Sequence, residues 1–301
     1  TVGEMSSTSI GACVEYTRPE NRELSMVFNF HHLKVDYASG RKWTLMDPDI
    51  PALKRLLNDW SLGLQDGGGW NALFWNNHDQ PRAIDRFGDA DRFRYESATM
   101  LATAIHLMRG TPYVYMGEEI GMSDPGYTTI EDYVDIEARN AFAELVAAGH
   151  EADEAFRIVH SKARDNARTP MQWDASASAG FTDGVPWLRP TNQDEVNVAY
   201  EEASGRILPY YRRLIALRKS VPVISGGAYE PYALDDPDIM AYVRHDEEHR
   251  LLVVCSFRGH ETGIDLPTDF LGGEVLISNY PLRSLRERMS LRPYEALALL
   301  V

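Results

Sequence analysis

Residues 73–82 constrain the fold of this chain more than any other segment, and they read LFWNNHDQPR. An apolar stretch runs directly into the polar segment 76–79, which predicts a buried strand with hydrogen-bonding groups and a carboxylate at its end. In a parallel β/α barrel, active sites are built at the carboxyl ends of the strands. Pro81 has no N–H to donate, so we expect it to stop the strand. The segment therefore favours an α/β barrel with a polar site at one rim.

Three further segments follow the same pattern along the chain. They are residues 1–5 (TVGEM), residues 110–122 (GTPYVYMGEEIGM) and residues 164–174 (RDNARTPMQWD). Together with residues 73–82 they resemble the conserved segments of the α-amylase superfamily, in the form found in oligo-1,6-glucosidases and related α-glucosidases. The resemblance covers essentially the whole chain.

The resemblance implies an α/β fold in two parts. Residues 1–225 are expected to form the C-terminal half of a catalytic (β/α)8 TIM barrel, strands 5 to 8, with a long insertion at 121–190. Beyond residue 225 the pattern changes, and short apolar runs at 238–244, 250–257, 274–277 and 297–301 predict antiparallel strands. We expect residues 226–301 to form an all-β sandwich domain with a local core that folds independently.

Helical and strand patterns alternate in the first part, as a barrel requires. Residues 26–30 predict a buried parallel strand, and a helix is expected to open at residue 49. A long helix is predicted over 91–109, with Gly110 as its C-terminal stop. The insertion is expected to contain a helical stretch over about 129–162. Residues 207–220 predict the final barrel helix.

The family's nucleophile is an aspartate in a Gly-Phe-Arg-x-Asp segment on the strand before Glu4, and no such segment occurs among the 301 residues. We therefore expect the chain to be the C-terminal half of an enzyme and to be inactive alone. Half a barrel leaves two strand edges unpaired, and exposed edges favour pairing with another chain. Self-association of the half-barrel is the expected consequence.

Composition excludes several classes of partner. The formal net charge is −15, which argues against nucleic acid and anionic membranes because both attract basic patches. A neutral sugar is compatible with that charge. The two cysteines, Cys13 and Cys255, stand among apolar neighbours and are expected to be buried thiols. No long apolar run is present, so we expect no membrane span and a cytoplasmic location.

The resemblance assigns roles to four side chains. Hydrolysis of a glycosidic bond with retention uses two carboxyl groups about 5–5.5 Å apart. Glu4 is implied as the general acid/base, with partial burial expected to raise its pKa. Asp79 is implied as the third carboxylate, which hydrogen-bonds the hydroxyls of the reacting sugar. His78 would donate to the same hydroxyls, and Arg164 is implied as the substrate-binding arginine.

Other candidates carry weaker predictions. Arg168 is expected to form a salt bridge within its loop rather than to bind substrate. Glu118 and Glu119 are expected to lie behind the site. His31 and His32 offer no complete ligand set, and the resemblance implies catalysis with no metal and no cofactor. Three tryptophans are either sugar platforms or core residues: Trp43, Trp75 and Trp173.

The sequence thus predicts a retaining α-glucosidase for short α-linked glucosides such as isomalto-oligosaccharides, maltose or sucrose. A trehalose-phosphate hydrolase would have much the same C-terminal half. A sucrose isomerase is disfavoured because such enzymes usually depart from the glutamine that follows the aspartate, and Gln80 is present. A non-catalytic subunit of an amino-acid transporter is disfavoured because Glu4, His78, Asp79 and Arg164 are all present.

Overall fold

The computed structural model describes residues 1–301. Its first part holds a four-stranded parallel sheet in the order β1-β2-β3-β4. The strands are β1 (Val2–Met5), β2 (Met26–Asn29), β3 (Asn71–Leu73) and β4 (Thr111–Pro112). Helices α1 (Ile10–Thr17), α2 (Ile50–Asp66), α3 (Ala83–Phe87) and α4 (Arg94–His106) lie between them along the chain. This order confirms the predicted α/β class.

Local sequence explains where these elements begin and end. The side chain of Asp49 caps α2 by accepting a hydrogen bond from the Ala52 N–H at 2.8 Å, and a proline occupies the first turn. Strand β3 ends at Leu73, so Pro81 is not what stops it. Phe74 and Trp75 are buried beyond the ladder instead.

The helix predicted over 91–109 is shorter at both ends, because α4 covers only Arg94–His106. Gly110 is therefore not its C-terminal stop. Its φ is +143°, and a Cβ at this position would lie 2.7 Å from the carbonyl oxygen of Asn71. Glycine is required at this position because the backbone passes close to β3.

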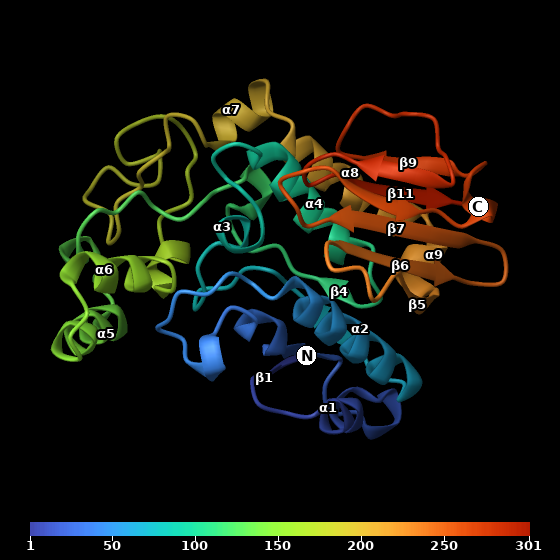
Figure 1. The fold of residues 1–301 in the computed structure, drawn as a ribbon, viewed down its shortest axis with the longest axis horizontal. Helices are drawn as coiled ribbons and strands as arrows, with labels where there is room; N and C mark the ends of the chain where they lie inside the picture. The colour runs from blue at the N-terminus through green and yellow to red at the C-terminus, as the bar shows by residue number, and fades with distance from the viewer.

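The insertion contains two helices, α5 (Ile136–Ala147) and α6 (Ala152–His160), rather than one helical stretch. Gly149 separates them with φ +99°. Both lie at the opposite end of the molecule from the C-terminal sheet (Figure 1). Next come α7 (Val198–Ala203) and α8 (Ile207–Ser220), and α8 confirms the predicted final barrel helix. The short 3-10 helices are η1 (Pro19–Asn21), η2 (His31–Lys34), η3 (Ala38–Gly40), η4 (Glu118–Ile120), η5 (Ile130–Asp132), η6 (Arg164–Ala167) and η7 (Thr268–Phe270).

After α9 (Pro222–Gly226), the last part of the chain forms two antiparallel sheets. The larger has the order β5-β6-β7-β11-β9, and the smaller pairs β10 with β8. Four of these strands confirm the predicted runs, whereas β5, β8 and β10 were not predicted. The bounds are β5 (Ala228–Tyr232), β6 (Ile239–His245), β7 (Arg250–Ser256), β8 (Thr262–Asp265), β9 (Glu274–Ser278), β10 (Arg288–Leu291) and β11 (Ala296–Leu300).

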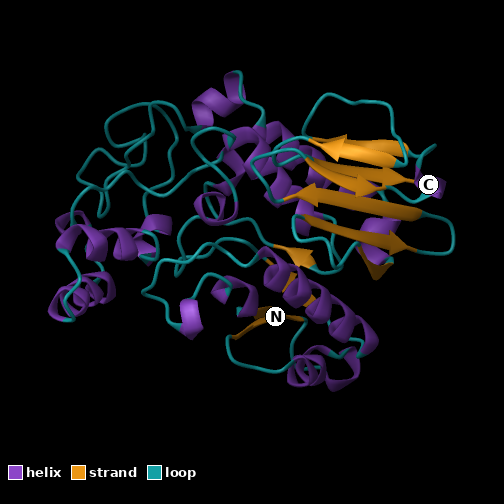
Figure 2. Cartoon of the chain, in the orientation of Figure 1, coloured by secondary structure: helices purple, strands orange, loops and turns teal.

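The C-terminal strands share a core with helices of the first part, so the expectation of a purely local core is wrong, whereas independent folding of the β domain stays a prediction. A cluster of 36 buried residues joins α2, α4 and α8 to one face of the larger sheet, and Figure 2 shows helices behind these strands. The Tyr242 hydroxyl donates to the carbonyl of Ala104 at 2.9 Å, and Arg244 donates to that of Leu107 at 3.0 Å. A smaller cluster of 12 residues packs the other face against β8 and β10.

Two further expectations can be compared with the structure. Cys13 and Cys255 are free and buried, as predicted. None of the helices combines the length and apolar character that crossing a membrane requires.

Candidate active site

A hollow of about 200 Å³ opens at the carboxyl ends of the four parallel strands. Its lining comes from β1, from β2 and the residue after it, and from the segments that follow β3 and β4. It is lined by Glu4, Phe28, Phe30, Phe74, Asn76, Asn77, His78, Tyr113, Val114 and Tyr115. The fold thus brings Glu4 and His78 into one hollow, while Asp79 adjoins it without lining it.

Glu4 lies in β1 directly opposite Phe28 of β2. Its side chain is exposed, so the expected partial burial is wrong for this structure. The hollow around it is walled largely by aromatic rings, and Phe28 meets both Phe74 and Tyr113 edge-to-face. A glutamate at this position faces solvent on one side and rings on the other.

Asp79 is held by its own turn and by an arginine. The Asn77 side chain accepts a hydrogen bond from the Asp79 N–H at 2.9 Å, which fixes the turn after β3. Arg168 Nη2 donates to Asp79 Oδ1 at 3.0 Å, and Arg168 Nε donates to the His78 carbonyl at 2.7 Å. His78 Nε2 lies 3.4 Å from the Asp79 carboxylate. The Asp79 side chain remains 45% exposed, so a ligand can reach it.

Arg164 is bound mainly by Asp135 rather than by Asp79. It forms a two-pronged pair with Asp135 at 2.7 and 2.9 Å, whereas its distance to Asp79 is 3.6 Å. The hydrogen bond from Arg164 holds the pKa of the Asp135 carboxyl below its usual value. Arg164 does not line the 200 Å³ hollow. Of the two arginines in this loop, Arg168 is the one in hydrogen-bond contact with Asp79.

Beneath the hollow lies a buried polar layer. Asn76 accepts a hydrogen bond from the Ala83 N–H at 2.7 Å and donates to Glu118. Burial raises the pKa of Glu118 to about 8, so the acid is largely protonated at neutral pH. Arg82 is fully buried and donates to the carbonyl of Met116 at 2.6 Å. Glu118 therefore supports the segment 76–78 from behind, where sequence analysis expected it.

The remaining candidates have structural surroundings. His32 is buried, with Nε2 2.9 Å from the Phe74 carbonyl oxygen. The structure places no group of three or more histidine, cysteine, aspartate or glutamate side chains to hold a metal ion. Trp75 is a core residue, since it is 2% exposed and donates to the Leu101 carbonyl. Trp173 is half exposed.

Sequence reasoning missed Asp135, the partner of Arg164. It lies in a separate loop from Arg164, and no spacing signal connects the two residues. Chemically, the arrangement offers an accessible glutamate across an aromatic hollow from a histidine, with an aspartate beside it that an arginine keeps in place. Such groups can donate a proton and hydrogen-bond several hydroxyls of a sugar.

Comparison with known proteins gives the family of the chain. Residues 1–227 match the family described as alpha amylase, catalytic domain, and residues 239–297 match the alpha-amylase SusG C-terminal domain. The chain is 47% identical over 303 residues to a trehalose-6-phosphate hydrolase of Bacillus subtilis (strain 168), covering 99% of this chain and 54% of that protein. It is 45% identical to an oligo-1,6-glucosidase of Halalkalibacterium halodurans, covering 98% of this chain and 54% of that protein.

Solved structures give the same result. The crystal structure of Bacillus licheniformis trehalose-6-phosphate hydrolase superposes with a TM-score of 0.96 at 46% identity, covering all of this chain and 55% of that one. The chain spans about half the length of the curated relatives it matches.

Proposed function

This chain belongs to the α-amylase family, and from that premise we propose that it carries the acid/base side of the active site of a retaining α-glucosidase. The substrates would be short α-linked glucosides such as isomalto-oligosaccharides, maltose or sucrose. The observation that supports this most is the shared hollow of Glu4 and His78 with Asp79 beside it. Oligo-1,6-glucosidases among the relatives support the substrate class.

Each group has a role in this proposal. Glu4 protonates the leaving oxygen of the glycosidic bond. Asp79 and His78 hydrogen-bond the hydroxyls of the reacting ring, and bonds that strengthen in the transition state raise turnover. Arg168 is a positioning residue, because it fixes the Asp79 carboxylate and the His78 backbone together. Arg164 remains the proposed substrate contact at the edge of the site, oriented by Asp135.

The acid role of Glu4 can be tested in a protein in which these residues follow a strand bearing the catalytic aspartate. Glu4→Gln is expected to slow substrates with poor leaving groups, such as isomaltose, far more than a nitrophenyl α-glucoside, because only the poor leaving group needs a proton. Glu20→Gln, at an exposed glutamate in η1, is the matched control and should leave both rates unchanged.

Asp79→Asn should depress both substrates alike. Equal losses for both substrates in Glu4→Gln would contradict the acid role. A chain of these 301 residues alone is expected to give no turnover, since no nucleophilic carboxylate is proposed within it. Its rate sets the baseline of the assay.

A second candidate is hydrolysis of trehalose 6-phosphate. It is favoured by the relatives at 46–47% identity that bear this name. Comparing kcat/KM for trehalose 6-phosphate, trehalose and isomaltose decides between the candidates. A clear preference for the phosphorylated sugar would replace the first candidate with the second.

We also propose a cytoplasmic location. Both cysteines are free thiols. Unpaired cysteines are usual in proteins kept in a reducing compartment. Cell fractionation with an antibody to this chain is the check, and recovery from the extracellular fraction would contradict the proposal.

A further inference from the structure

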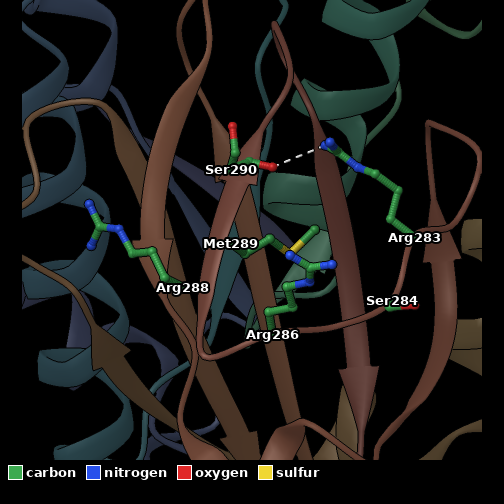
Figure 3. Close-up of a pocket in the computed structure, with 6 residues that line it drawn as sticks. All are labelled: Arg283, Ser284, Arg286, Arg288, Met289 and Ser290. Atoms are coloured by element: carbon green, nitrogen blue, oxygen red, sulfur yellow. Dashed lines mark hydrogen bonds between the residues drawn. The ribbon is translucent and has the colours of Figure 1, made fainter.

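A second hollow lies on the C-terminal sheets, far along the chain from the candidate active site. Its volume is about 380 Å³, and it lies between β10 and the loop that precedes it (Figure 3). The lining consists of three arginines, two serines and one methionine, with no carboxylate: Arg283, Ser284, Arg286, Arg288, Met289 and Ser290. In a chain of net charge −15 this is an unusual concentration of cations.

Two of the arginines retain unused donors. Arg283 Nη2 donates to the Ser290 carbonyl and to Glu295 Oε2, both at 3.0 Å (Figure 3 shows the first bond). This leaves its Nε and Nη1 without a partner. Arg288 Nη1 donates to Asp265 at 2.9 Å, and both side chains of that pair are largely exposed. An exposed pair of this kind contributes little and exchanges readily for another anion.

Arg286 has no partner at all. It forms no hydrogen bond, no carboxylate lies within 4 Å of its guanidinium, and its side chain is exposed. In Figure 3 the Arg286 guanidinium lies between Arg288 on one side and Arg283 on the other. Glu295 is buried and also receives Arg292, and Glu261 accepts from Ser290, whereas the exposed Glu287, next to Arg286 in the sequence, forms no ion pair.

We propose that this hollow binds a phosphate monoester, with Arg286 as its principal contact. Guanidinium groups present paired N–H donors that match phosphate oxygens two at a time, and the serine hydroxyls add further donors. The volume suits a small ligand such as a sugar phosphate. A long polyanion is disfavoured because the rest of the molecule is acidic and offers no basic track beyond the hollow. The site does not depend on the activity of the barrel.

The test uses isothermal titration calorimetry on the 301-residue chain at low salt, with inorganic phosphate, glucose 6-phosphate and glucose as probes. Saturable binding is expected for both phosphates and not for glucose. Arg286→Gln should weaken binding about tenfold, as the loss of a charge-assisted hydrogen bond predicts. Arg212→Gln, at an exposed arginine of α8 whose partner is Glu202, is the matched control and should bind as the unaltered chain does.

The two probes distinguish the sources of the phosphate. Tighter binding of glucose 6-phosphate supports a sugar phosphate as the ligand, and equal binding supports free phosphate in the same site. Absence of saturable binding overturns the proposal. So does phosphate binding that Arg286→Gln leaves unchanged, since that phosphate would occupy the barrel rim instead.

Discussion

His106 is a buried histidine whose two ring nitrogens have different surroundings. Nδ1 lies 2.8 Å from the Ala102 carbonyl oxygen, which can only accept, so Nδ1 carries the proton. Nε2 is buried without a partner. A second proton would therefore place an unpaired charge in the core, and burial lowers the pKa of His106 to about 4.

This environment predicts a pH dependence of stability. An unfolded histidine has a pKa of about 6.5, so between about pH 6.5 and pH 4 this side chain binds a proton in the unfolded chain but not in the folded one. The contribution of His106 to the free energy of unfolding should therefore fall as pH falls through this window, by up to about 1.4 kcal/mol per pH unit. Urea unfolding at several pH values measures the slope.

His106→Asn should reduce that slope, even though the variant is less stable overall. His260→Asn is the control, because His260 is exposed. His32 is also buried, with its pKa lowered to about 4, so part of the slope remains in His106→Asn. An unchanged slope in this variant would contradict the assignment to His106.

At the residue scale, the sequence predicted which side chains lie close together. It predicted less well which of them form hydrogen bonds with one another. Glu4 lies on β1 and residues 76–79 follow β3, and any parallel sheet places these strand ends at one rim, so their convergence could be predicted. The choice between Arg164 and Arg168 could not, because both lie in one loop and only the turn of η6 decides which guanidinium faces Asp79. The exposure of Glu4 depends on what surrounds β1 in space, which local pattern does not encode.

At the scale of elements, three segments meet at one buried carboxylate. Asp36, after β2, accepts from Arg86 of α3 at 2.7 and 3.1 Å and from Lys162, just after α6, at 2.6 Å. All three side chains are at most 5% exposed. Burial alone would raise the pKa of Asp36, but the two cations outweigh it and hold the pKa below its usual value. This triad fastens the insertion to the barrel just before the loop of Arg164 and Arg168.

Asp36→Asn should destabilise the chain by about 3–5 kcal/mol, because it leaves two buried cations with no counter-charge. Chemical unfolding at pH 7 measures the difference. Glu202→Gln is the matched control, since its pair with Arg212 is exposed and should contribute no more than about 1 kcal/mol. A loss as small in Asp36→Asn as in the control would show that the triad does not fasten these segments.

Element boundaries were predictable where a local signal exists. Asp49 as the N-cap and the proline in the first turn predict the start of α2. The helical spacing over residues 207–220 predicts the bounds of α8. No local signal marked β8 and β10, which pair only with each other and pack over the larger sheet. Such short strands are stabilised by tertiary contacts rather than by their own pattern.

At the scale of the whole molecule, the parallel sheet has two open edges. β1 pairs only with β2, and β4 pairs only with β3. Val2, Tyr113 and Val114 beside these edges are each 36–42% exposed. Unpaired strand edges with apolar neighbours favour pairing with another chain.

We therefore propose that a chain of these 301 residues self-associates. Light scattering across micromolar concentrations should give a mass above the 34.0 kDa of one chain. Val114→Lys places a charge beside the β4 edge and should shift the distribution toward the monomer, whereas Val185→Lys, at a fully exposed loop residue away from the sheet, should not. A monomer at all concentrations would contradict the proposal.

The shared core has a consequence for the order of events during synthesis. Every residue of α4 from Ser97 to His106 is buried, and much of the covering surface comes from β6, β7 and β11. Roughly 130 residues separate the end of α4 from the start of β6. At about 5–20 residues per second, the ribosome needs on the order of ten seconds to supply that cover. During this interval the apolar face of α4 is uncovered, so the nascent chain is most prone to aggregation before the strands from β6 onward emerge.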